Sequence, residues 1–260
     1  MTTFTISDPV VARLRFHGGE VHVETATDGR ATATVEPLDP SNDRSAQAAA
    51  AARIECTGTK LTVDVPGKGR WGGGAKVRIH LSLPPRSTVM SDSGDVRLQA
   101  SGTLDGVRVR TGSGDVEVGD VRQVDVKAGD ARVVINGSPD NVMFVTGNGQ
   151  LTADGVGDLM FKTGHGKATV GSSRGQVWVK GGNVGLDLGA ATKGEVLFQT
   201  GAGSARVGVA EGTSVQLDLQ SSLGDVRCDL AMEDGAPQGG SDLKVKLFTG
   251  LGDLVVARAS

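Results

Sequence analysis

One short glycine phrase recurs through the last two thirds of the chain. It consists of a glycine, one further residue and, in most copies, a second glycine, with an aliphatic side chain close behind. The step from Gly94 to Gly114 is 20 residues, and so is the step from Gly129 to Gly149. The copies begin at Ser93, Thr111, Ala128, Thr146, Thr163, Lys180, Thr200, Ser222 and Thr249. A fixed period of this length is typical of proteins built from stacked structural repeats.

Between the glycines, apolar and polar residues alternate strictly. Val124-Asp-Val126-Lys and Leu243-Lys-Val245-Lys-Leu247 are two examples. A period of two predicts β-strands with one face buried and one face in water. Each repeat holds two such runs of about five residues, or about 16 Å each, and two turns. Two short strands with tight corners would make one flattened coil.

The pattern therefore predicts an all-β fold, a β-solenoid of stacked coils of about 20 residues. Glycine is expected at the corners, where positive φ or close packing of the neighbouring coil is needed. A series of antiparallel hairpins with glycine in their turns would also give alternation. The return of one phrase in one register favours the stack.

The first third of the chain has a different pattern. Residues 1–86 contain strand-like segments and an alanine run from Ala46 to Ala52, which follows Ser41-Asn-Asp43. Ser, Asn or Asp before alanines predicts an N-capped helix, here near residues 43–53. We expect residues 1–86 to form a β-rich cap with this one helix, and residues 87–260 to form the solenoid.

Composition excludes several classes of function. The formal net charge is −3, so the chain lacks the basic character of proteins that bind nucleic acid. The start shows no secretory pattern and no run approaches 18 apolar residues, which predicts a cytoplasmic protein without a membrane span. Aromatic residues make up 3% of the chain, which weakens sugar-stacking functions.

Two regions are candidates for partner contact because the repeat breaks there. The first is the basic glycine loop at residues 67–74, where an exposed tryptophan could anchor a partner. The second is the last strand, which directly follows a repeat and leaves an open end for a protein partner or a second copy. The candidate contact residues are Lys68, Arg70, Trp71, Leu254 and Val256.

No catalytic, metal-binding or cofactor-binding pattern emerges. The loop at residues 67–74 lacks the spacing of a phosphate-binding loop. The aspartates after the turn glycines would form a calcium ladder only if they continued, but Gln150, Lys167 and Ser204 interrupt the series. We therefore interpret those aspartates as turn formers and expect no cofactor and no metal.

The segments Val77 to Pro85 and Ser87-Thr-Val89, with the Ser-Gly-Asp-Val copies at 93–96 and 113–116, resemble the bacterial "putative adhesin" family of β-strand repeats. The resemblance extends over essentially the whole chain and begins near Val11. It implies an all-β repeat fold and a family of unknown function, in which some members are linked to envelope stress or surface attachment. It supplies no catalytic residues.

Three functional hypotheses follow. The first is a non-enzymatic scaffold that presents flat β-faces to partners and self-associates through its ends. The second is an adhesin-like module that binds glycan or envelope polymer, for which Trp71 and Trp178 are the available tryptophans. The third is a carbohydrate-active β-helix enzyme, which would need a groove lined by several carboxylates on one face.

Overall fold

The computed structural model describes residues 2–6, 8–66, 75–230 and 241–259. Two compact units divide the chain, Met1–Arg132 and Val133–Ser260. The loop predicted at residues 67–74, with Lys68, Arg70 and Trp71, lies outside the described residues. The predicted boundary at residue 86 falls inside the first unit and stays a prediction.

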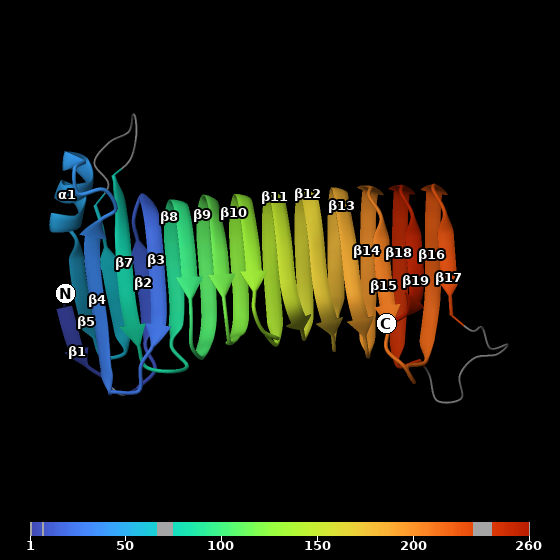
Figure 1. Cartoon of the computed structure of the whole chain (residues 1–260), viewed down its shortest axis with the longest axis horizontal. Coiled ribbons are helices and arrows are strands. Elements are labelled where there is room, and N and C mark those ends of the chain that lie inside the picture. Colours follow the sequence, from blue (N-terminus) through green and yellow to red (C-terminus); the bar gives the residue numbers. More distant parts are fainter. Residues whose placement is uncertain (1, 7, 67–74, 231–240, 260) are drawn as a thin grey trace. The chain divides into compact units, whose positions relative to one another are not determined.

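The first unit combines a parallel stack with an antiparallel end (Figure 1). Strand β8 pairs in parallel with β2 through its first half and with β3 through its second half, and β9 follows β8 in the same way. At the other side, β1 pairs antiparallel with β4, β4 with β7, and β5 with β6. The strands are β1 (Thr2–Thr5), β2 (Val11–Arg15), β3 (Gly18–Thr25), β4 (Arg30–Pro37), β5 (Arg53–Thr57), β6 (Lys60–Asp64), β7 (Lys76–Leu83), β8 (Thr88–Ala100), β9 (Leu104–Val118) and β10 (Val121–Ile135).

The predicted helix is present as α1 (Asp43–Ala50). The side chain of Asn42 caps its start by accepting hydrogen bonds from the backbone N–H groups of Arg44 and Ser45. The buried Ser45 hydroxyl in turn accepts from the backbone N–H of Lys76 in β7, which ties the helix to the sheet. The prediction of a single short helix in a β-rich first third is therefore confirmed.

The second unit is a stack of parallel coils (Figure 1). Its longest strands run through a corner, so that one strand supplies both sides of a coil. The strands are β11 (Asn141–Val156), β12 (Asp158–Ser173), β13 (Val177–Ala191), β14 (Gly194–Ala202), β15 (Ala205–Val209), β16 (Val215–Leu223), β17 (Val226–Asp229), β18 (Leu243–Leu251) and β19 (Leu254–Arg258). The predicted all-β solenoid is confirmed, and the hairpin alternative is not.

The coil is slightly shorter than predicted. Val142 lies opposite Leu159, Leu159 opposite Val177, and Val177 opposite Val196, which gives steps of 17, 18 and 19 residues. The estimate of 20 came from counting between non-equivalent glycines. In the stack Ser93 lies opposite Thr111, a step of 18, so the partner of Gly94 is Gly112 and not Gly114.

The corners explain the recurring Thr-Gly-x-Gly phrase. The threonines are buried, and each donates its hydroxyl hydrogen bond to the carbonyl oxygen two residues later, at 2.7 Å for Thr163 and for Thr200. Gly203 has φ +129°, and a Cβ there would lie 2.1 Å from the carbonyl oxygen of Val184 in the coil below. The threonine satisfies a buried corner carbonyl, while the glycine allows the coils to approach.

The interior contains aliphatic side chains and a short phenylalanine column. Phe144 and Phe161 lie on adjacent strands with ring centroids 5.2 Å apart, and both are fully buried with Phe198. Thin aliphatic layers were expected from the scarcity of aromatic residues. Three of the six phenylalanines nevertheless stand in this interior.

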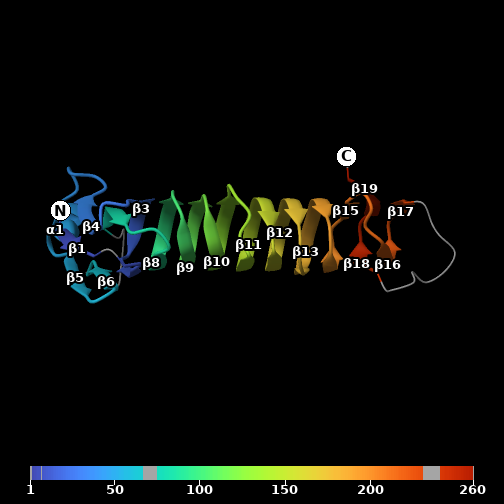
Figure 2. The ribbon, with the colours of Figure 1, turned by 90° about the horizontal axis from the view of Figure 1, so that it is seen from below.

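The coils of the second unit are not stacked in chain order. Strand β18 pairs with β14 on one side and with β16 on the other, and β19 lies in the same way between β15 and β17 (Figures 1 and 2). The last coil in sequence is therefore an inner coil. The coil made of β16 and β17 is the outermost one.

Candidate functional site

The expected open end at the C-terminal strand is wrong. Leu254 and Val256 in β19 are both fully buried, because β15 covers one side of β19 and β17 covers the other. Their side chains are core residues and cannot contact a partner in this structure. Sequence order misled the prediction, because it assumed that the last strand in the chain is also the last strand in the stack.

The open edge of the second unit is instead β16 with β17. Among the described residues, β16 pairs only with β18, and β17 only with β19. The backbone carbonyl of Ser214 accepts from Leu243 in β18. Because alternate residues of a strand point their amide and carbonyl to the same side, those of Val215, Leu217 and Leu219 point to the free edge.

Apolar side chains accompany this edge. Val215, Leu217 and Leu219 occupy core positions but are only half-buried, since no further coil covers them. Leu223 is 66% exposed and Val226 46% exposed. An edge of this kind, with unpaired backbone groups and apolar side chains, is a template for pairing with another chain.

The corner of the coils becomes apolar toward this edge. The residue between the two glycines of the phrase lies in one register column, which reads Asn148, His165, Asn183, Ala202, Leu251 and Leu223. The polar members stand in the inner coils, and Leu251 and Leu223 stand in the last two. The change of polarity coincides with the open edge.

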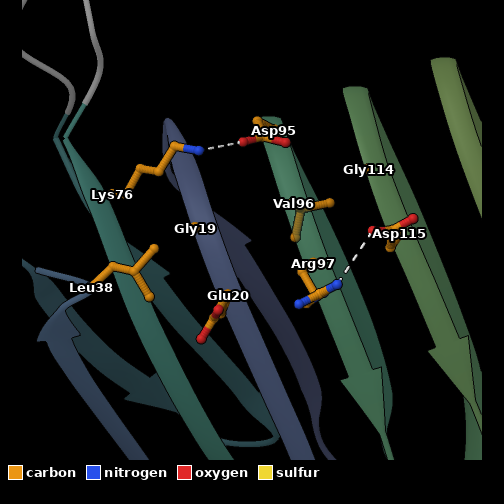
Figure 3. A pocket seen from close by; sticks show the side chains of 9 residues that line it. All are labelled: Gly19, Glu20, Leu38, Lys76, Asp95, Val96, Arg97, Gly114 and Asp115. Carbon is orange, nitrogen blue, oxygen red and sulfur yellow. Dashed lines mark hydrogen bonds and ion pairs between the residues drawn. The ribbon is translucent and has the colours of Figure 1, made fainter.

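A shallow hollow lies on the outer face of the first unit. Its volume is about 180 Å³, and its lining includes Glu20, Lys76, Asp95, Arg97 and Asp115 (Figure 3). Lys76 Nζ lies 2.9 Å from Asp95 Oδ2, and Arg97 Nη2 lies 3.8 Å from Asp115 Oδ2. The volume is below the range of about 300–1,000 Å³ that is usual for small-molecule sites.

The charges of this face form a ladder rather than an acid–base pair. Glu36, Arg78, Glu20, Arg97 and Asp115 lie side by side on five neighbouring strands, with alternating sign. Arg78 Nε lies 2.9 Å from the Glu20 carboxylate. Such cross-strand pairs stabilise a sheet.

The environment of Glu20 also opposes a role as a general acid. The hydrogen bond from Arg78 holds the pKa of Glu20 below its ordinary value, whereas a general acid needs a raised pKa. The neighbouring His22 ring is stacked on His80 at 5.1 Å. The hollow therefore lacks the arrangement that a carbohydrate-active enzyme would need.

No metal centre is formed by the part of the chain that the structure describes, where no three His, Cys, Asp or Glu residues come together. Asp225 and Asp253 stand in adjacent coils, where Asp253 Oδ1 accepts from the backbone N–H of Asp225 at 3.0 Å. Cys56 and Cys228 are free thiols, and burial raises the pKa of Cys56. Within the described ranges, no helix has the length and apolarity of a membrane span.

A family model matches residues 13–247, under the description Toastrack DUF4097. The chain belongs to this family. The resemblance to a β-strand-repeat family of unknown function is thereby confirmed. The first residue of the match lies in β2 and the last in β18, so the family pattern covers strands of both units.

Solved structures of bacterial proteins are also similar to this chain. A putative adhesin from Bacteroides fragilis NCTC 9343 is 13% identical, with a TM-score of 0.45, over 98% of this chain and 95% of that one. A putative adhesin from Parabacteroides merdae ATCC 43184 is 14% identical, with a TM-score of 0.38, over 97% and 94%. A putative cell adhesion protein from Clostridium sporogenes ATCC 15579 is 11% identical, with a TM-score of 0.28, over 98% and 94%. A comparison with curated proteins finds no match.

Proposed function

We propose that this chain is a non-enzymatic interaction scaffold that pairs with a second copy through the β16–β17 edge. The observation that carries the proposal is the position of this coil, which leaves a parallel strand unpaired beside half-buried core residues. Edge-to-edge pairing would satisfy the free backbone groups and cover the apolar row in one step.

The two-fold dimer is the assembly that this edge supports best. An edge that meets its own copy forms a closed, self-complementary interface. The antiparallel strands β1 and β5 and the helix α1 give the first unit a different kind of border. Pairing of like edges therefore predicts dimers rather than open filaments.

Sedimentation velocity over a range of concentrations tests the proposal. We expect the wild-type chain to shift from monomer to dimer as concentration rises. The double variant Leu223→Lys, Val226→Lys should stay monomeric, because lysine on an edge opposes pairing. The matched control is Gln216→Lys, Gln220→Lys, which adds the same charge to the outer face of β16.

A wild-type chain that stays monomeric at every concentration would refute the proposal, as would equal dimerisation of the edge variant and its control. A further variant replaces residues 231–240, which connect β17 to β18, with a glycine–serine segment of equal length. We expect this variant still to dimerise.

An adhesin-like binding module for glycan or envelope polymer is the second candidate. The observation that favours it is the exposure of Trp178, which is 48% exposed on the outer face of β13. Binding to purified cell-wall glycan, lost in Trp178→Thr, would support this function. The cytoplasmic location expected from the sequence stays a prediction, which cell fractionation tests.

A further inference from the structure

One outer face of the second unit carries a strip of large apolar side chains. Met143, Met160, Trp178 and Leu197 lie in direct register on β11, β12, β13 and β14. These four strands lie side by side in Figure 1. Met160 is 44% exposed and Trp178 is 48% exposed, while Met143 and Leu197 are half-buried. We call these four residues the apolar strip.

The fold itself does not require the strip. The residues before and after each member point inward and are buried, for example Val177 and Val179 beside Trp178. The strip residues therefore occupy the outward positions of the alternation, which are polar elsewhere on these strands. Lys167, Thr169 and Asp187 on the other run of the same coils are examples. A line of four large apolar residues at outward positions marks a binding surface.

Charge flanks the strip on one side. Two residues further along the strands, Lys162 of β12 and Lys180 of β13 lie in register with each other and are exposed. Neither ammonium group has an ion-pair partner among the described residues. On the opposite flank, Glu195 is paired with Lys246 at 2.9 Å. The uncompensated charge beside the strip is therefore positive.

We propose that the apolar strip is a docking site for an amphipathic helix of a partner protein, with acidic residues along one side of its apolar ridge. Adjacent strands are about 4.8 Å apart, so the four side chains span about 14 Å. An apolar ridge of four residues on a helix, at i, i+3 or i+4, i+7 and i+11, spans about 16 Å. The helical pitch thus nearly matches the spacing of the strands, and one ridge residue can meet each strand.

The side chains of the strip suit this occupant better than others. Methionine adapts its shape to varied partners, and an exposed tryptophan is a common anchor of protein interfaces. Sugar rings need aromatic faces, but three of the four side chains are aliphatic. An anionic membrane would require a basic protein, whereas the net charge is −3. Acidic side chains on the helix would pair with Lys162 and Lys180.

The fluorescence of Trp178 provides a direct assay. The chain has two tryptophans, so the variant Trp71→Phe leaves Trp178 as the sole reporter. The probe is a synthetic helical peptide of about 15 residues, with leucine along one ridge and glutamate along the row beside it. The control peptide carries lysine in place of every glutamate. We expect a blue shift of Trp178 emission with the glutamate peptide only.

Charge reversal provides the second readout. Lys162→Glu with Lys180→Glu should weaken binding of the glutamate peptide by at least about tenfold, measured by anisotropy of a labelled peptide. The matched control Lys193→Glu changes an exposed lysine in the turn between β13 and β14 and should leave affinity unchanged. Trp178→Thr, which keeps a good strand former at an outward position, should abolish binding.

Equal binding of the two peptides would overturn the proposal, and so would the absence of any peptide binding. A Trp178 shift caused instead by a β-glucan oligosaccharide, or by vesicles of phosphatidylcholine with phosphatidylglycerol, would assign the strip to glycan or lipid and overturn it as well. The strip does not depend on dimerisation. Peptide binding should therefore persist in the variant Leu223→Lys, Val226→Lys, which separates the two proposals.

Discussion

The order of the last coils predicts a reversal in the cost of two identical substitutions. Leu247 of β18 lies between Phe198 of β14 and Leu219 of β16, and it is fully buried. Leu219 stands in the same column on the outermost coil and is half-buried. Replacing a fully buried leucine with alanine costs about 3–5 kcal/mol of unfolding free energy. For Leu219, where water already reaches the side chain, we expect about 1–2 kcal/mol.

Urea unfolding of Leu247→Ala and Leu219→Ala, followed by far-UV circular dichroism, measures both costs. The protein should be dilute, so that pairing of copies does not bury Leu219. If β16 lay between β14 and β18, as chain order suggests, Leu219 would be the interior residue and the ranking would be inverted. A cost for Leu219→Ala that equals or exceeds that of Leu247→Ala would refute the observed order.

Two further predictions concern a charge and a corner. Arg78 lowers the pKa of Glu20 in the folded state, so the stability from this pair is present above the unfolded pKa and is lost as pH falls through the lowered value. Glu20→Gln should therefore cost up to about 1 kcal/mol at neutral pH and almost nothing near pH 3 in urea unfolding, and an equal cost at both would contradict this. Gly203→Ala should cost about 2 kcal/mol or more, because φ is +129° and a Cβ would meet the carbonyl oxygen of Val184. Gly212→Ala, at φ +72° in open space, should cost only about 1 kcal/mol, so similar melting temperatures for the two variants would count against the corner geometry.

The repeat and the alternation were sufficient to predict the fold class. Alternation identified the buried residues, and the cap before an alanine run identified α1. The coil length was overestimated, because the phrase contains two glycines and the sequence does not say which of them are equivalent. Ser93 opposite Thr111 settles the register.

The order of the coils was not predicted, although a signal was present. Thr249-Gly-Leu-Gly matches Thr200-Gly-Ala-Gly more closely than Ser221-Ser-Leu-Gly does. The corner threonine matters because its hydroxyl serves a carbonyl in the next coil as well: Thr249 donates to Gly203 at 2.9 Å. Closer similarity of the phrase thus reflected direct stacking of the coils.

The apolar strip was beyond reach of the sequence for a different reason. Alternation places Trp178 at an outward position, but it does not say which outward residues of other coils lie beside it. Steps of 17, 18 and 19 residues are needed to align Met143, Met160, Trp178 and Leu197. A uniform step of 20 would have scattered them.

Amide hydrogen exchange at increasing protein concentration tests the edge most directly. At low concentration, the amides of Val215, Leu217 and Leu219 should exchange quickly, because they point to the free edge, while those of β18 exchange slowly. At high concentration, exchange in β16 should slow and β18 should remain unchanged. Faster exchange in β18 than in β16, or no effect of concentration on β16, would contradict the account.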